Sequence, residues 1–270
     1  MYIGGGTTLE NLKDEASLYI YTPTTDTWDL MDTPVSLFAL TTYRSQLVLV
    51  GGIEYVGERP GPLTNKLWTL SEYDHWQETL PPMKRKRYGA SAVSYRDHLL
   101  VVGGESMLEI YNSRYWVETR CSLSRQCWDM KSTILNGYWY LMGGYEQEEE
   151  VCYASLDSLI QASEISQPLS VWKKLPDVPY ELCSSAVLGD RLIAVGGLPL
   201  TSGIYAYSPL THSWMHVGEL PAMVSNTCTV NLPTGELMVI GGLPAVTMST
   251  VFKVILKGMI KFVDDQMQIN

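Results

Sequence analysis

Three features of the 270-residue sequence predict an all-β fold made of repeated antiparallel sheets. First, a Gly-Gly doublet begins at residues 4, 51, 103, 143, 196 and 241, which gives a period of 40 to 53 residues. Second, the fifteen residues that end at each of the last five doublets align without a gap, from Phe38, Ala90, Met130, Cys183 and Cys228. Third, the apolar runs have strand patterns and no helical periodicity. A period in this range is typical of the blades of a β-propeller.

Each doublet-ending segment predicts a hairpin of two strands, which we name a and b. Two apolar runs flank a short turn whose residues accept the positive φ of a tight hairpin. The turns are placed at Ser45-Gln46, Asp97-His98, Asn136-Gly137, Gly189-Asp190 and Thr234-Gly235. The doublet ends strand b, because glycine permits a positive φ and the close approach of a neighbouring chain.

A second hairpin, of strands c and d, is predicted after a variable b–c loop. Its clearest copies run from Tyr21 to Trp28 and from Tyr207 to Trp214, with six residues between the two rings. Leu-Pro pairs follow within residues 80–83, 175–179 and 220–223, where proline ends strand d. The insertion at residues 155–170 in the fourth repeat is expected to be a surface loop.

By these motifs the sequence resembles the Kelch repeats, in which an apolar strand ends in Gly-Gly and a tyrosine, six residues and a tryptophan follow. The resemblance covers nearly the whole chain and implies four-stranded blades around a channel, with strand a innermost. The residues that carry it are Gly51, Gly52, Gly103, Gly104, Gly143, Gly144, Gly196, Gly197, Gly241, Gly242, Tyr21, Trp28, Tyr207 and Trp214.

A six-bladed Kelch-type β-propeller is therefore expected at residues 1–257, followed by a C-terminal tail at 258–270. Its blades start near residues 1, 33, 82, 123, 179 and 223. The first repeat has no segment for strand a and the sixth has none for strand d, so the ring is expected to be incomplete at the N-terminus. In the alternative interpretation, residues 258–263 fill one of these gaps.

The composition limits the environment and the partners. A net charge of −10 and a pI near 4.9 disfavour nucleic acid and anionic lipid as partners. No apolar run approaches the roughly 18 residues of a membrane span, and no secretory signal begins the chain. The five cysteines form no C-x-x-C pair, and Cys183 and Cys228 share one apolar position of the repeat. We therefore expect reduced cysteines and a cytoplasmic protein.

In a propeller of this strand order, the d–a connections and b–c loops emerge on one side, which we name the loop face. The a–b turns on the other side are short and uniform, whereas the b–c loops vary in length, so binding is expected on the loop face. The candidate partner-binding residues are Tyr55, Arg59, Lys84, Arg85, Lys86, Arg87, Tyr145, Glu146 and Glu148.

Two charged clusters dominate this set: residues 84–87 before the third repeat and residues 146–150 in the b–c loop of the fourth. Three interpretations are open, namely ion pairs between the clusters, a basic spot that grips an acidic peptide, and simple solvation. The chain also resembles Kelch propellers that read peptides with an arginine at the start of several inner strands. Arg87 matches that position, sixteen residues before its doublet, where the other repeats hold Val35, Cys127, Tyr180 and Ser225.

Signals of catalysis and of metal binding are weak. His212 and His216 would lie about 13 Å apart on one strand, too far to chelate a single metal. No serine or cysteine has a recognisable base partner. We therefore expect no enzymatic activity, no cofactor and no metal.

The sequence thus predicts a monomeric interaction module, or scaffold, that binds a protein or peptide on the loop face. One alternative is the substrate-recognition module of a ubiquitin ligase in a longer parent protein, as in several Kelch families. A sugar-acting Kelch-type enzyme is another, although it needs carboxylates with arginine or histidine on inner strands that hold mostly small and apolar residues. The last is a truncated product with no function of its own.

Overall fold

A computed structural model describes residues 2–4, 7–8, 13–14, 16–56, 59–124, 126–142, 144, 151–164, 171–176, 178, 183–208, 211–232, 235–242, 251–254, 260–263 and 266–269. The chain divides into two compact units. The first unit holds residues 1–129 and 157–171, and the second holds residues 130–156 and 172–270.

The strands of the first unit are β1 (Tyr2–Gly4), β2 (Thr7–Thr8), β3 (Lys13–Asp14), β4 (Ser17–Thr22), β5 (Thr27–Asp32), β6 (Val35–Ser36), β7 (Ala39–Tyr43), β8 (Gln46–Val50), β9 (Ile53–Val56), β10 (Arg59–Leu63), β11 (Leu67–Leu70), β12 (Trp76–Gln77), β13 (Ser91–Tyr95), β14 (His98–Val102), β15 (Met107–Tyr111) and β16 (Trp116–Ser122). The second and third repeats form complete antiparallel sheets in the orders β7-β8-β11-β12 and β13-β14-β15-β16. The first repeat forms the sheet β1-β4-β5, which holds strands b, c and d as predicted.

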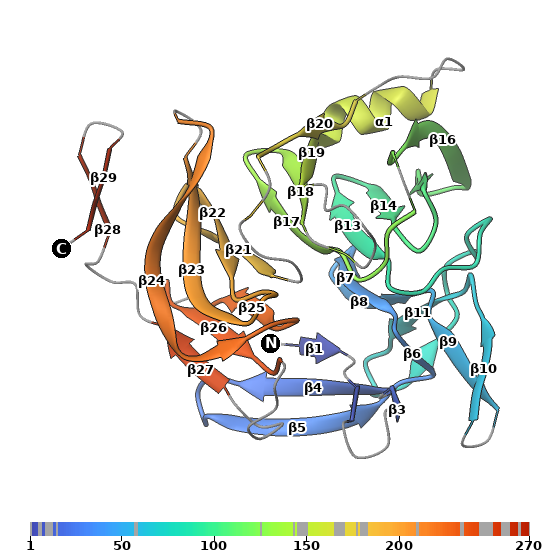
Figure 1. The fold of residues 1–270 in the computed structure, drawn as a ribbon. Helices are drawn as coiled ribbons and strands as arrows, with labels where there is room; N and C mark the ends of the chain where they lie inside the picture. The colour runs from blue at the N-terminus through green and yellow to red at the C-terminus, as the bar shows by residue number, and fades with distance from the viewer. Residues whose placement is uncertain are drawn as a thin grey trace. The chain divides into compact units, whose positions relative to one another are not determined.

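The strands of the second unit are β17 (Lys131–Leu135), β18 (Tyr138–Met142), β19 (Cys152–Ser155), β20 (Lys173–Lys174), β21 (Ser184–Leu188), β22 (Arg191–Val195), β23 (Thr201–Ser208), β24 (Ser213–Val224), β25 (Cys228–Asn231), β26 (Leu237–Ile240), β27 (Val251–Val254), β28 (Ile260–Val263) and β29 (Gln266–Ile269). The fourth and fifth repeats form the four-stranded sheets β17-β18-β19-β20 and β21-β22-β23-β24, and Figure 1 shows the latter in yellow to orange. The sixth repeat forms β25-β26-β27, and β28 pairs with β29. The predicted all-β fold and the order of strands a to d are confirmed, while the count of six blades stays a prediction.

The apolar core lies between the sheets of successive repeats. In the first unit, Val48 and Val50 on β8 pack with Leu99 and Val101 on β14, all at most 1% exposed. In the second unit, one cluster joins the fourth and fifth repeats and another joins the fifth and sixth. The b strands β8, β14 and β22 are buried over most of their length, which is typical of strands covered on both faces and agrees with their continuous apolar runs.

The glycine doublets tie each sheet to the next repeat through the backbone. The second glycine of the doublet donates its N–H to the carbonyl oxygen of the residue four positions before the start of the next inner strand. The three described bonds are Gly52 to Arg87 at 2.7 Å, Gly104 to Cys127 at 2.8 Å and Gly197 to Val224 at 2.8 Å. The two backbones come so close that a Cβ on Gly104 would lie 2.5 Å from the carbonyl oxygen of Tyr88. The φ of Gly104, +67°, also favours glycine.

The tryptophans of strand d form a second tie, in the opposite direction along the chain. Each indole Nε1–H donates to a backbone carbonyl at the end of the previous repeat's strand d or in the connection that follows it. Trp76 donates to Asp32 at 2.9 Å, Trp116 to Pro81 at 2.7 Å and Trp214 to Pro176 at 3.0 Å. Two of the Leu-Pro marks, at residues 80–83 and 175–179, therefore supply partners of the tryptophans after strand d has ended. The prediction that proline ends strand d is wrong at residues 220–223, because β24 continues to Val224.

Two predicted turns are one residue too late, and one repeat contains an extra residue. Tyr43 pairs with Gln46 and Tyr95 with His98, so the two-residue turns are 44–45 and 96–97 rather than 45–46 and 97–98. In the sixth repeat Asn231 pairs with Leu237, which leaves a five-residue turn. The gap-free alignment is therefore wrong there.

The longer turn changes which residues of the sixth repeat are equivalent to those of the fifth. Cys183 directly precedes β21, whose Ser184 pairs with the residue before the doublet, and Cys228 pairs in the same way. The counterpart of Cys183 is therefore Thr227. Both of these are 1% exposed, whereas Cys228 is exposed, so its prediction as a core residue is wrong.

The insertion predicted to be a surface loop contains the helix α1 (Leu156–Glu164). Leu156, Leu159 and Ala162 recur at three-residue spacing and are at most 2% exposed, so one face of the helix is buried. This spacing is the signal of an amphipathic helix, although the run is too short to stand out among strand patterns.

We expect Trp116→Phe to lower the free energy of unfolding by about 2–4 kcal/mol, because it removes the N–H that satisfies the Pro81 carbonyl and shrinks a buried ring. The same change at Trp28, whose side chain is 37% exposed, is expected to cost less than about 1 kcal/mol. Urea denaturation followed by circular dichroism measures both. Equal losses in the two variants would show that the indole bond does not hold the repeats together.

We expect Gly104→Ala to lower the free energy of unfolding by more than about 3 kcal/mol, since a positive φ and a backbone clash act together. Gly189→Ala is the matched control, because its φ is +60° and a Cβ there meets nothing within 4 Å. The control is expected to lose about 1 kcal/mol from backbone strain alone. Thermal denaturation of the two variants compares them, and a control as unstable as Gly104→Ala would contradict the role of close approach.

Candidate functional site

The loop-face candidates described in the first unit lie on two segments. Tyr55 is half-buried on β9, and Arg59 is exposed at the start of β10. These strands form a hairpin that extends the b–c loop of the second repeat and pairs with β6. Residues 84–87 lie between β12 and β13, in the d–a connection that precedes the third repeat.

Arg87 is fully buried, which corrects the expectation that it lies on an exposed rim. Its side chain and that of Glu109 on β15 are both 0% exposed, and Nη2 of Arg87 lies 3.0 Å from Oε1 of Glu109. The guanidinium also donates to the carbonyl oxygens of Gly103 at 2.9 Å, Glu105 at 3.4 Å and Met107 at 2.5 Å. These carbonyls belong to the doublet and the b–c loop of the same repeat, so Arg87 fixes the course of that loop.

The Glu109 carboxylate also holds the d–a connection by its backbone. Oε2 of Glu109 accepts the N–H of Lys84 at 2.7 Å, and Oε1 accepts the N–H of Arg85 at 3.1 Å. Burial lowers the pKa of Arg87, and the Glu109 carboxylate opposes this shift. Arginine keeps its proton in protein interiors, so this interior contains a full ion pair with additional hydrogen bonds.

The other basic side chains of this segment differ in exposure. Arg85 forms an ion pair with Glu118 on β16 and lies 3.7 Å from the Glu105 carboxylate, and its hydrogen bond to Glu118 raises its pKa. Lys84 and Lys86 are exposed, and neither forms an ion pair with a residue that the structure describes. Arg85 is thus paired within its own repeat, while the two lysines point their charge to solvent.

The remaining three candidates belong to the b–c loop of the fourth repeat. Tyr145, Glu146 and Glu148 lie outside the described residues. The predicted pairing between the acidic cluster and the basic cluster therefore stays a prediction.

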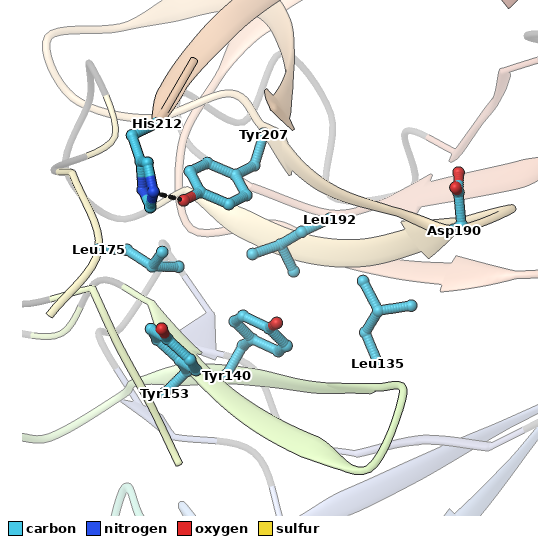
Figure 2. A pocket seen from close by; sticks show the side chains of 8 residues that line it. All are labelled: Leu135, Tyr140, Tyr153, Leu175, Asp190, Leu192, Tyr207 and His212. Carbon is cyan, nitrogen blue, oxygen red and sulfur yellow. Dashed lines mark hydrogen bonds between the residues drawn. The ribbon is translucent and has the colours of Figure 1, made fainter. Parts of the chain in front are cut away.

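A pocket in the second unit was not predicted from the sequence. Its volume is about 140 Å³, and Leu135, Tyr140, Tyr153, Leu175, Asp190, Leu192, Tyr207 and His212 line it. Figure 2 shows one wall from the fourth repeat, with Tyr140, Tyr153 and Leu135, and a facing wall from the fifth, with Leu192 and Tyr207. The repeat motif includes Tyr207, but no motif indicates a pocket, because the lining residues become neighbours only when two sheets pack face to face.

Two kinds of site are absent from the described residues. No helix there is long and apolar enough to cross a membrane. Within the same residues, no three histidine, cysteine, aspartate or glutamate side chains gather where they could hold a metal ion.

We expect Glu109→Gln to lower the free energy of unfolding by about 3–5 kcal/mol, because it leaves the Arg87 guanidinium charged and buried without its carboxylate. Glu118→Gln is the matched control. Its side chain is 30% exposed, so it is expected to lose less than about 1 kcal/mol. Urea denaturation at neutral pH measures both, and a variant at position 109 as stable as the control would contradict the structural role of the ion pair.

Comparison with known proteins agrees with the repeat pattern. The chain is 25% identical to Kelch-like protein 24 of Rattus norvegicus and of Mus musculus, over 75% of its own length. It spans 40% of the length of these relatives. No family model matches the sequence. The sequence match, the six doublets and the repeated antiparallel sheets together support a distant relationship of this chain to the Kelch-repeat family.

Proposed function

We propose that this chain is a non-enzymatic interaction module that binds an acidic segment of a protein partner on its loop face. The observation that carries the proposal is the d–a connection before β13. A buried ion pair fixes its backbone, and two lysine charges remain on its surface. A rigid loop with exposed charges loses little conformational entropy when a partner binds, which favours affinity.

Arg59 is added to these two lysines because the predicted strand order assigns its hairpin to the same loop face. It is exposed on β10, whose two prolines, Pro60 and Pro62, protect the edge of the hairpin against pairing with another strand. Contacts through side chains are therefore favoured over added strands. We name the three exposed basic residues Arg59, Lys84 and Lys86 the basic set, and they replace the wider list of candidates that included the buried Arg87.

The opposite turns of the first unit provide a matched comparison. Arg44, Arg96 and Arg114 are exposed, and they lie on a–b or c–d turns. Arg44 and Arg96 already contact Asp97 and Asp157 respectively. The regular two-residue turns that carry the first two have a structural role, so we expect no partner contacts there.

Replacing the basic set by alanine is expected to weaken capture of the chain's cellular partners by about tenfold or more, because three exposed charges each contribute up to about 1 kcal/mol. Affinity capture with quantitative mass spectrometry, at low and high salt, measures this loss. Alanine at Arg44, Arg96 and Arg114 is the control and is expected to leave capture unchanged. If the control variant loses partners that the variant without the basic set still captures, binding lies on the turns and the proposal is contradicted.

Recognition of substrates for a ubiquitin ligase is a more specific form of the same proposal. It is supported by the Kelch-family match, in which the chain spans only 40% of the length of the curated relatives. If it holds, partners that depend on the basic set are ubiquitinated in cells that express the full parent protein, and alanine replacement of the set abolishes the modification. Unchanged ubiquitination of bound partners would overturn this form and leave the interaction itself standing.

A further inference from the structure

The pocket of the second unit has the dimensions of a site for one side chain. Its volume of about 140 Å³ is close to the ~150 Å³ of a protein cavity that accepts a benzene molecule. The apolar part of the lining is formed by Leu135, Leu175 and Leu192. The Tyr140 and Tyr153 rings stack with centroids 5.4 Å apart and an interplanar angle of 13°, so together they form one extended aromatic wall.

Polar groups with unused hydrogen-bonding capacity line the same space. Neither the Tyr140 hydroxyl nor the Tyr153 hydroxyl forms a hydrogen bond with a described residue, whereas the Tyr207 hydroxyl lies 3.0 Å from Nδ1 of His212. Figure 2 shows this contact at one side of the pocket, with Asp190 at the other side. Burial raises the pKa of Tyr140 and of Tyr207, so both phenols stay neutral near pH 7.

The charge of the lining favours a cation. Asp190 belongs to the lining, its side chain is 73% exposed, and no lysine or arginine lines the pocket. Two basic residues lie nearby. Nε of Arg191 is 3.6 Å from Oδ1 of Asp190, but Arg191 alternates with Leu192 on β22 and so points to the other face of the sheet. Lys173 pairs in register with Tyr153 and is exposed.

We propose that this pocket binds the arginine side chain of a protein partner. The three leucines match the aliphatic stem of arginine, and the tyrosine wall offers ring faces to its planar guanidinium. The Asp190 carboxylate supplies the counter-charge, and the unused phenol oxygens accept N–H groups. A planar guanidinium stacks on such a wall better than a lysine ammonium does.

The test titrates four small probes into the chain with ¹³C-labelled tyrosine rings and follows the ring signals by nuclear magnetic resonance. The probes are acetyl-arginine amide, acetyl-citrulline amide, acetyl-leucine amide and free arginine. The blocked arginine is expected to shift the Tyr140 and Tyr207 signals, and the citrulline probe, of the same shape without charge, is expected to bind at least fivefold more weakly. Citrulline or leucine binding as tightly as arginine, or no shift with any probe, would overturn the proposal. Tighter binding of free arginine would also overturn it, in favour of a small-molecule site.

Two variants locate the binding. Asp190→Asn is expected to weaken the binding of acetyl-arginine amide by about three- to fivefold, and Tyr140→Leu is expected to weaken it by about tenfold. Asp97→Asn is the matched control, because Asp97 has the same place in the a–b turn of the third repeat and a side chain that is 76% exposed. The substituted aspartates are both exposed, so neither change threatens folding. Equal binding by the Asp190→Asn and Asp97→Asn variants would contradict the role of Asp190.

Discussion

The fold depends on one recurring backbone hydrogen bond, which the second glycine of three described doublets, Gly52, Gly104 and Gly197, donates to a carbonyl oxygen shortly before the next inner strand. The bond forms only where two backbones approach without an intervening Cβ, which is why two glycines recur while the loops after them vary. It joins the end of strand b in one repeat to the start of strand a in the next. The tryptophan bonds run in the reverse direction. Both kinds of bond are described between the second and third repeats, so these two sheets are fastened at an inner and at an outer strand.

The sequence predicted most of this framework because its signals are local. Apolar runs, Gly-Gly ends and Tyr-Trp pairs lie within a few residues of the strands they specify, and the sheets have the predicted order. The predictions failed where the structure depends on the exact number of residues in a hairpin or on the content of an insertion. The a–b hairpin of the sixth repeat contains one residue more than the others, which places Cys228 at an exposed position. The insertion of the fourth repeat, predicted to be a surface loop, contains a nine-residue helix.

The candidate site was predicted less well, because burial of a charge depends on residues far along the chain. Arg87 and Glu109 are separated by 22 residues, and nothing local to Arg87 distinguishes it from its exposed neighbours. A carboxylate in the middle of the apolar strand MLEIY was a signal of a buried partner, since isolated buried charges are too costly to persist. The tyrosine pocket had no comparable signal, because its two walls come from different repeats.

The buried Arg87 also affects how the surface of this protein should be mapped. If the proposed loop face binds the partner, a scan that removes positive charges one by one would show a large loss of binding at Arg87, although its side chain is 0% exposed and no partner can touch it. Its removal releases the carbonyls of one loop and the backbone of another, so the recognition surface would lose its shape rather than a contact. Epitope maps of such repeats therefore require a measure of folding beside each measure of affinity.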